Sequence, residues 1–327
     1  MPLDLAALFR SLRAGGDASA TDLMAVPIPE FPSHRVARTA EGRPAVLLAC
    51  RDGDYRSYSA PVRLENLSVQ YAVACRVIHN DGRREDGNFT VVICSAPDTA
   101  VESQFLRVAG LLVEALGSNP SRLDVTRNVE ALVELFRVLS EPPRKTVQGL
   151  WAELFLIARS SRPDELVAAW HVQPEDRFDF SSGNQRIEVK AAAGRQRLHH
   201  FSLEQLQAIP SAEVVIASVF IERSGSGVSL RNLIDRIRTR LVSQPSLGLR
   251  VETTVAATLG DHLRRSLDDA FDLQLANHSL RCFRQQDVPV IGAVPPGVSH
   301  VHFRADLEAI NPVECGADAP GIFGGLS

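Results

Sequence analysis

The fold is decided by one stretch, residues 177–190, which reads Arg177-Phe178-Asp179-Phe180-Ser181-Ser182-Gly183-Asn184-Gln185-Arg186-Ile187-Glu188-Val189-Lys190. Two runs of alternating apolar residues flank a Gly-Asn turn signal, and this pattern predicts a β-hairpin. If the turn is centred on Gly183 and Asn184, Asp179 lies directly opposite Glu188 on the partner strand. Lys190 follows two residues later and therefore shares a face with Glu188.

Two carboxylates that face each other across a strand pair repel and destabilise it. A divalent cation between them reverses the sign of that interaction. Asp179 and Glu188 would then bind Mg²⁺ or Mn²⁺ and leave positions for water and phosphate, with the backbone carbonyl of Val189 as a further ligand. Lys190 would orient or deprotonate the water and stabilise negative charge. This set points to metal-assisted phosphodiester hydrolysis; the alternative is a salt-bridged surface on which Lys190 only neutralises the acids.

A helix expected at about residues 146–160 adds a third acid, Glu153. Its apolar residues form one face and extend around the helix: Val147, Leu150, Trp151, Leu154, Phe155 and Ala158, with Leu156 and Ile157 beside them. Glu153 shares a stripe with Gly149 on this apolar surface, so its carboxylate is expected to be partly buried and to need a partner. Glu153 therefore either joins the metal site or pairs with an arginine.

These residues follow the order of the PD-(D/E)XK nucleases, in which a helix with an acid precedes an Asp at a strand end and a Glu-x-Lys strand. At Glu153, Asp179 and residues 188–190 the sequence resembles that superfamily, which includes many restriction enzymes and repair nucleases. It is more similar still to one branch, the prokaryotic "PD-(D/E)XK motif protein" family, whose members tend to sit in defence-type operons. That likeness is carried by residues 149–154, 188–191 and 197–206, and it extends over most of the chain.

The resemblance implies a catalytic set of Glu153, Asp179, Glu188 and Lys190, and Mg²⁺ or Mn²⁺ held by Asp179, Glu188, Val189 and Glu153. It implies a restriction-endonuclease-like domain and a DNA endonuclease acting in anti-phage defence, with DNA and other defence-operon proteins as partners. Double-strand cleavage by such folds usually needs two active sites, so a homodimer is a candidate assembly. The alternative is an inactive nuclease-fold module that binds nucleic acid or partner proteins, which the net charge of −4 favours.

The sequence departs from the superfamily at one position, because Phe178 rather than Pro precedes Asp179. Asp176 is a rival for the acid at this strand end. With the turn at residues 183 and 184, however, Asp176 points to the face opposite Glu188 and Lys190, so Asp179 is preferred. A slip of one residue in the register would reverse that preference.

A local cationic cluster accompanies the hairpin and consists of Arg186, Arg195, Arg197, His199 and His200. Beside a metal site, such a cluster would bind the phosphates of a nucleic acid. The alternative is an ordinary exposed loop.

The fold class expected from the whole chain is α/β (α+β overall), with a mixed sheet flanked by helices. The segment Glu141-Pro142-Pro143-Arg144-Lys145 interrupts the pattern, so we expect an N-terminal α+β accessory module at residues 1–140 and the nuclease-like domain at 141–327. The first part contains strand patterns at 45–50, 69–78 and 89–94 and helical ones at 99–116 and 125–139. The second adds a short helix capped by Ser202, a strand at 213–221 and a helix capped by Ser229. The tail is expected to form a helix near 261–271 and strands near 273–283, 289–293 and 298–303.

The bulk properties narrow the function classes. A hydrophobic content of 45% and a charged content of 23% are those of a soluble globular protein, and the net charge of −4 excludes a global basic field for nucleic acid. The five cysteines lack C-x-x-C spacing, which argues against a disulfide framework and a thiolate zinc site. No phosphate-binding Gly-rich loop, signal peptide or bilayer-spanning stretch is evident, so we expect a cytoplasmic protein without ATPase activity.

Overall fold

The computed structural model describes residues 3–12, 22–51, 60–96, 98–139, 146–171, 176–314 and 319–326. The chain forms two compact units, Met1–Glu141 with Val242–Thr253 and Pro142–Leu241 with Thr254–Ser327. Residues 242–253, which were expected in the second part, therefore belong to the first unit. There Glu252 is buried, with its carboxylate 2.9 Å from the Gln104 amide and 3.0 Å from the Arg107 guanidinium. The Pro-Pro segment at 141–145 lies outside the described residues.

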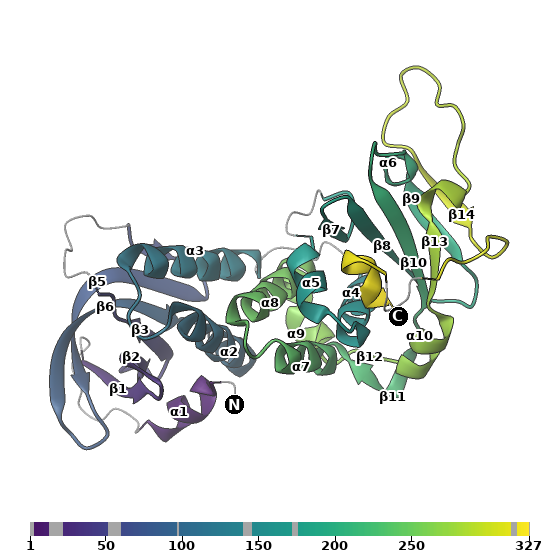
Figure 1. The fold of residues 1–327 in the computed structure, drawn as a ribbon. Coiled ribbons are helices and arrows are strands. Elements are labelled where there is room, and N and C mark those ends of the chain that lie inside the picture. Colours follow the sequence, from purple (N-terminus) through teal and green to yellow (C-terminus); the bar gives the residue numbers. More distant parts are fainter. Residues whose placement is uncertain are drawn as a thin grey trace. The chain divides into compact units, whose positions relative to one another are not determined.

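The first unit is built on a six-stranded sheet with the strand order β1-β2-β3-β6-β5-β4. Its strands are β1 (Asp22–Ile28), β2 (Phe31–Arg38), β3 (Pro44–Leu48), β4 (Val62–Arg63), β5 (Leu67–Ile78) and β6 (Arg84–Cys94). β1 also pairs in parallel with β5, so five of the strands, which are labelled in Figure 1, form a closed barrel. A core of mostly small apolar side chains, such as Ala25, Ala37 and Ala45, packs with Phe89. The strands at 45–50, 69–78 and 89–94 are confirmed, whereas β1 and β2 were not predicted.

Three helices accompany this sheet: α1 (Leu5–Ser11), α2 (Thr99–Leu116) and α3 (Arg122–Val138). The predicted helices at 99–116 and 125–139 are therefore confirmed. α3 begins earlier than predicted because Ser121 and Asp124 form a capping box at its N-terminus. Helix α8 (Pro245–Leu259), of which only the part up to Thr253 belongs to this unit, was not predicted.

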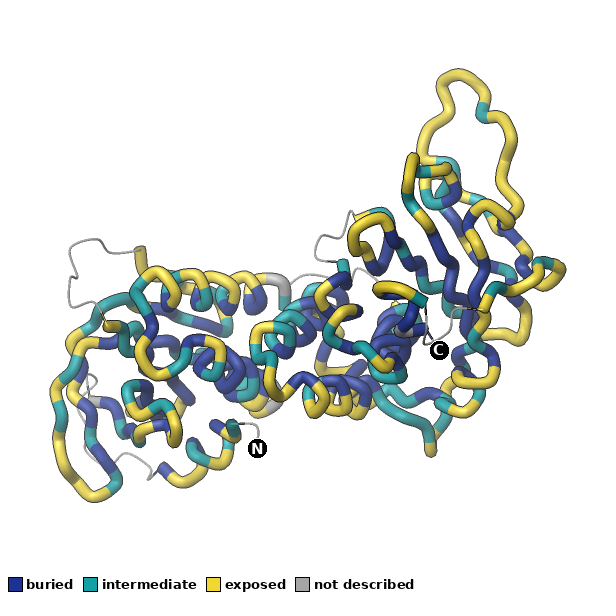
Figure 2. The backbone as a smooth tube through the Cα atoms, viewed as in Figure 1, coloured by how far each residue is buried: buried dark blue, intermediate teal, exposed yellow. Residues whose placement is uncertain are grey.

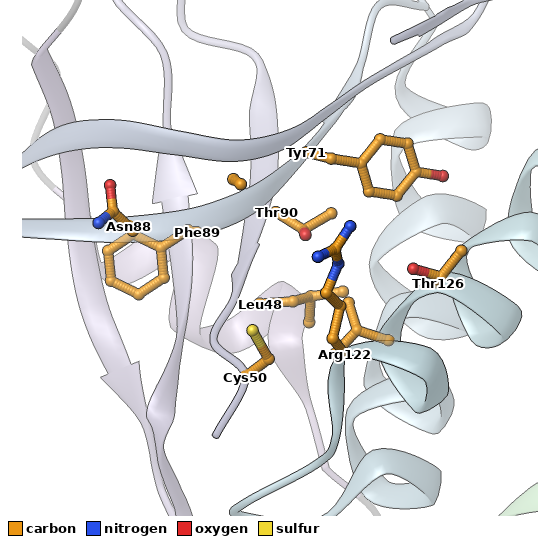
Figure 3. A pocket seen from close by; sticks show the side chains of 10 residues that line it. Leu48, Cys50, Tyr71, Asn88, Phe89, Thr90, Arg122 and Thr126 are labelled. Atoms are coloured by element: carbon orange, nitrogen blue, oxygen red, sulfur yellow. The ribbon is translucent and has the colours of Figure 1, made fainter. Parts of the chain in front are cut away.

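A small cavity lies between the sheet and the start of α3 (Figure 3). Side chains of β5, β6 and α3 line it, among them Tyr71, Thr90, Arg122 and Thr126. Its volume is about 20 Å³, which is space for one water molecule rather than for a nucleotide. The residues that carry the predicted chemistry all lie in the second unit.

The second unit contains a four-stranded mixed sheet with the order β13-β10-β8-β7. Its strands are β7 (Phe180–Ser182), β8 (Gln185–Ala192), β10 (Glu213–Phe220) and β13 (Arg281–Arg284). β8 and β10 are parallel and the other neighbours are antiparallel. Helix α4 (Val147–Arg159) packs on β8 and on α7 (Leu230–Arg240), and α10 (Leu273–Ser279) packs on β10. The expected fold class, α+β with a mixed sheet flanked by helices, is confirmed.

A second layer adjoins this sheet and contains the antiparallel pair of β9 (Leu198–Ser202) and β14 (His302–Asp306). Helix α6 (Leu203–Leu206), which directly follows β9 in the chain, belongs to the same layer. Phe201 and Leu206 from this layer pack with Phe178, Ile216 and Phe283. Ile216 is the register partner of Glu188, and neighbours in a sheet project to the same face. Glu188 therefore projects toward the layer that contains β9 and α6.

The predicted hairpin is confirmed. Ser182 pairs with Gln185 and Phe180 pairs with Ile187, so the turn consists of Gly183 and Asn184. Gly183 has φ of +52°, a left-handed conformation that glycine adopts without steric cost. Continuing the same register by one residue places Asp179 opposite Glu188.

The second unit contains further elements. They are α5 (Pro163–Ala169), β11 (Arg223–Ser229), α9 (Leu263–Ser266), β12 (Ala270–Phe271) and the 3₁₀ turns η1 (Gly260–His262), η2 (Gln285–Asp287) and η3 (Gly321–Leu326). The capping boxes at Ser202 and Ser229 are present, and β10 lies where a strand at 213–221 was expected.

The predictions for the tail are partly wrong. Residues 273–279 form α10 instead of a strand because the Asp272 side chain accepts the Leu275 N–H and starts a helix. Residues 289–293 form part of an exposed loop, in which Val290 is 50% exposed (Figure 2). The predicted strand at 298–303 begins only at His302, and the helix predicted near 261–271 is limited to η1 and α9.

None of the helices in the described part of the chain combines the length and the hydropathy needed to cross a bilayer.

Candidate active site

Glu153 lies in the middle of α4 and is 2% exposed. α4 begins at Val147 because the Thr146 side chain accepts the Gly149 N–H. Residues 150–157 of this helix are all buried. Trp170 and His171 both contact the Glu153 carboxylate. Trp170 Nε1 donates to Glu153 Oε2 at 2.7 Å, and His171 Nε2 lies 3.1 Å from the same oxygen. These contacts satisfy the expectation that a carboxylate in this apolar helix needs partners.

Asp179 precedes β7 and is 6% exposed. Its Oδ2 accepts the Val189 N–H at 2.8 Å, and its backbone carbonyl accepts the His171 N–H at 2.8 Å. β7 does not extend to Val189, so the Asp179 side chain accepts the hydrogen bond that a carbonyl of a neighbouring strand would otherwise accept. The rival acid, Asp176, lies on the exposed surface.

Glu153, His171 and Asp179 come together in one group. One ligand atom from each residue can be chosen such that all three atoms lie within 4.8 Å of one another. Two carboxylates with an imidazole form a donor set that fits a divalent cation, because carboxylates suit Mg²⁺ and Mn²⁺ and imidazole suits transition metals. His171 was not predicted as a ligand. Its only signal in the sequence is its place between the two acids, next to Trp170.

Glu188 and Lys190 form a second group on β8, together with Gln205 from α6. Lys190 Nζ lies 2.7 Å from Glu188 Oε1, and Gln205 Nε2 donates to the same oxygen at 2.7 Å. Gln205 Oε1 accepts a hydrogen bond from Lys190 Nζ at 3.1 Å, and the ammonium also lies 4.9 Å from the centre of the Phe201 ring. Glu188 is 5% exposed.

The two groups adjoin at Val189, which lies between Glu188 and Lys190 in the chain. Its N–H binds Asp179. Because the N–H and C=O of one strand residue point to the same side of the strand, the Val189 carbonyl faces the edge occupied by Asp179. The structure therefore gathers Glu153 with Asp179 and Glu188 with Lys190, and it joins the two pairs through Val189. Among the described residues, Glu188 is not part of the three-ligand group with Glu153, His171 and Asp179.

Two members of the predicted cationic cluster, Arg197 and His199, are buried and contact groups of the chain itself, which argues against their predicted contact with phosphate. The Arg197 guanidinium donates to the Ser218 hydroxyl at 2.8 Å and to the Ser279 carbonyl, and it lies 4.5 Å from the centre of the Phe220 ring. His199 Nε2 lies 2.7 Å from the same hydroxyl, and burial lowers the pKa of His199 to about 4. His199 alternates with exposed His200 along β9, so it faces inward and is neutral at pH 7.

The other three members keep their predicted role as an open hypothesis. Arg195 and His200 are exposed, and Arg195 forms an ion pair with Glu222 at 3.2 Å. Arg186 is half-buried and donates to the carbonyls of Gly183 and Gln185.

We expect His199 to make the second unit less stable in acid. Its pKa in the folded chain, about 4, lies below the ordinary value of 6.5, so the unfolded chain binds the proton first as the pH falls. The contribution of neutral His199 is complete above pH 6.5 and is lost between pH 6.5 and pH 4, by about 3 kcal/mol. Urea unfolding from pH 7 to pH 4 should show a weaker pH dependence for His199→Gln than for the wild type. His200→Gln, at an exposed position on the same strand, is the matched control; equal slopes for all three proteins would contradict the prediction.

The model of one protein family, described as "Putative PD-(D/E)XK family member, (DUF4420)", matches residues 5–308. No curated protein and no solved structure matches the chain.

Proposed function

The chain belongs to this PD-(D/E)XK-type family, whose model spans nearly all of it, and from that membership we propose that it is a divalent-metal-dependent DNA endonuclease. The family points to a function of nuclease type. DNA as the substrate, dependence on a metal and a role in anti-phage defence, with other defence-operon proteins as partners, are parts of the proposal.

One observation carries the proposal: the three-ligand group of Glu153, His171 and Asp179 adjoins the strand segment Glu188-Val189-Lys190. Isolated buried carboxylates are costly, and partners or a metal offset that cost. Here two nearly buried acids are accompanied by an imidazole and by a backbone carbonyl that faces the same edge. A solvated, salt-bridged hairpin face does not require this arrangement.

Glu153, His171 and Asp179 would hold the cation, with the Val189 carbonyl as a further donor. A cation bound there would neutralise charge on the phosphate and lower the pKa of a bound water. The imidazole shifts the preference of the donor set from Mg²⁺ toward Mn²⁺, which accepts both carboxylates and nitrogen.

The Lys190 ammonium places a positive charge at this site. Lys190 is one of two lysines in the sequence, and its side chain is 16% exposed. Among the described residues the ammonium donates to Glu188 and Gln205, which leaves one of its three N–H bonds for an oxygen of the substrate. In that position Lys190 would stabilise negative charge that develops on the phosphate.

A second candidate function is an inactive nuclease-fold module that binds nucleic acid or a partner protein. The close pairing of Lys190 with Glu188 favours it, because the ammonium is already neutralised by a carboxylate of the chain. Metal binding discriminates between the two: the module should bind no Mn²⁺ or Mg²⁺ in a manner that depends on Asp179 and Glu153.

The direct test incubates the purified chain with labelled linear and supercoiled DNA, with Mn²⁺, with Mg²⁺ or with chelator. We expect cleavage with Mn²⁺, weaker cleavage with Mg²⁺ and none with chelator. A parallel reaction on RNA of the same sequence tests the assignment of DNA as the substrate. Undiminished cleavage with chelator, or none under any of these conditions, would overturn the proposal.

A further inference from the structure

Gln205 connects Glu188 and Lys190 of β8 to the turn at the start of α6. Its Oε1 accepts the Ser202 N–H at 3.2 Å and a hydrogen bond from Lys190 Nζ at 3.1 Å, and its Nε2 donates to Glu188 Oε1 at 2.7 Å. The Gln205 N–H in turn donates to the Ser202 hydroxyl, which completes the capping box. The Gln205 carbonyl accepts a hydrogen bond from Gln285 Nε2 at 2.6 Å. Both the backbone and the side chain of Gln205 are thus held.

The charges around the amide allow only one of its two orientations. Rotating the amide by 180° would bring its NH₂ group against two donors, the Ser202 N–H and the Lys190 ammonium, and its oxygen against the Glu188 carboxylate. The orientation with Oε1 toward Lys190 and Nε2 toward Glu188 satisfies all three neighbours. A single amide therefore fixes the distance between an ammonium and a carboxylate that lie on one strand.

We infer that Gln205 is a positioning residue, which holds Lys190 and Glu188 in the arrangement that DNA cleavage requires. This inference rests on the proposed nuclease function. Glu188 Oε1 receives both the ammonium and the Gln205 amide at 2.7 Å, so loss of the amide releases the carboxylate on one side and the ammonium on the other. The capping box with Ser202 uses only the oxygen of the same amide.

The two roles make opposite predictions for Gln205→Glu. Glutamate is a standard partner of serine in a capping box, and its carboxylate still accepts from Lys190, so a residue that only caps α6 tolerates the change. A positioning residue does not tolerate it, because the new carboxylate replaces a donor to Glu188 by a like charge. We expect kcat of Gln205→Glu to fall by about 10–100-fold, as for a misplaced catalytic group, with a much smaller change in KM.

Gln205→Met removes the side-chain contacts with Lys190, Glu188 and the Ser202 N–H at similar side-chain length, and it should lower kcat to a similar extent. Ser202→Ala is the matched control, because it removes the hydroxyl that caps α6 and leaves the contacts of Gln205 with Lys190 and Glu188. It should lower the melting temperature and leave cleavage per folded molecule close to that of the wild type.

A second measurement does not depend on nuclease activity. Lys145 and Lys190 are the two lysines of the sequence, so acylation by an amine-reactive ester at fixed pH can be followed at each by mass spectrometry, with Lys145 as the internal reference. Acylation of Lys190 relative to Lys145 should rise several-fold in Gln205→Met and stay unchanged in Ser202→Ala.

The inference would be overturned if acylation of Lys190 were unchanged in Gln205→Met and Gln205→Glu cleaved DNA as fast as the wild type. Gln205 would then be a capping residue. If acylation rises but the wild type cleaves no DNA, the positioning of Lys190 by Gln205 stands and the proposed nuclease function fails.

Discussion

Lys190→Met is expected to lower the rate of DNA cleavage by about 10²–10³-fold, the effect of removing one preorganised donor from a site where charge develops. Methionine has a similar length and no charge, so the loss is electrostatic rather than steric. The Lys190 ammonium lies 2.7 Å from Glu188 and next to Phe201, a setting in which a positive charge is poorly screened by water. Single-turnover cleavage of end-labelled DNA, with Mn²⁺ at saturation, measures the effect on the chemical step.

The variant also needs a stability control, because Lys190→Met leaves Glu188 without its cation. Breaking a buried ion pair on one side destabilises by about 3–5 kcal/mol, and unfolding would mimic a loss of catalysis. The double variant Glu188→Gln/Lys190→Met removes both charges and keeps the hydrogen-bonding group that faces Gln205. It should recover much of the stability without recovering cleavage. Recovery of cleavage together with stability would show that Lys190 acts only in folding.

Asp179→Asn is expected to weaken Mn²⁺ binding by about 10²-fold or more and to abolish cleavage. Loss of residues that merely support metal ligands costs about 10–100-fold in affinity, so loss of a ligand's charge should cost at least as much. Asparagine keeps an oxygen that can accept the Val189 N–H, now bound by Asp179 Oδ2 at 2.8 Å, so the strand edge is retained. Isothermal titration with Mn²⁺ measures the affinity without any substrate.

The matched control is Asp176→Asn, at an exposed acid three residues upstream of Asp179. It should bind Mn²⁺ as the wild type does. His171→Gln completes the series, and it should weaken Mn²⁺ binding more than Mg²⁺ binding because imidazole is the donor that distinguishes the two ions. Equal Mn²⁺ affinity in all four proteins would refute the metal site.

Signals between residues close in the sequence were sufficient to predict several elements. The Gly183-Asn184 turn determined the hairpin and its register, because a two-residue turn of this type permits one pairing of the strands. Period-two alternation then placed Glu188 and Lys190 on one face. Helix α4 and the capping boxes at Ser202 and Ser229 likewise depend on residues three or four apart. In the tail, Asp272 is a signal of the same kind, and the helix that it starts lies where a strand was predicted.

Which side chains meet was decided only by the tertiary structure. His171 reaches Glu153 because its backbone pairs with Asp179, and Gln205 reaches Lys190 because a second layer packs on the sheet. Burial of Arg197 and His199 depends on the same packing. Hydrogen bonds between neighbours in the chain can be inferred from spacing, since the backbone fixes their geometry. Contacts between distant segments depend on how the layers pack, and the single sequence does not encode this in any local pattern. The sequence by itself thus determined the acids and the lysine, whereas the fold determined their partners.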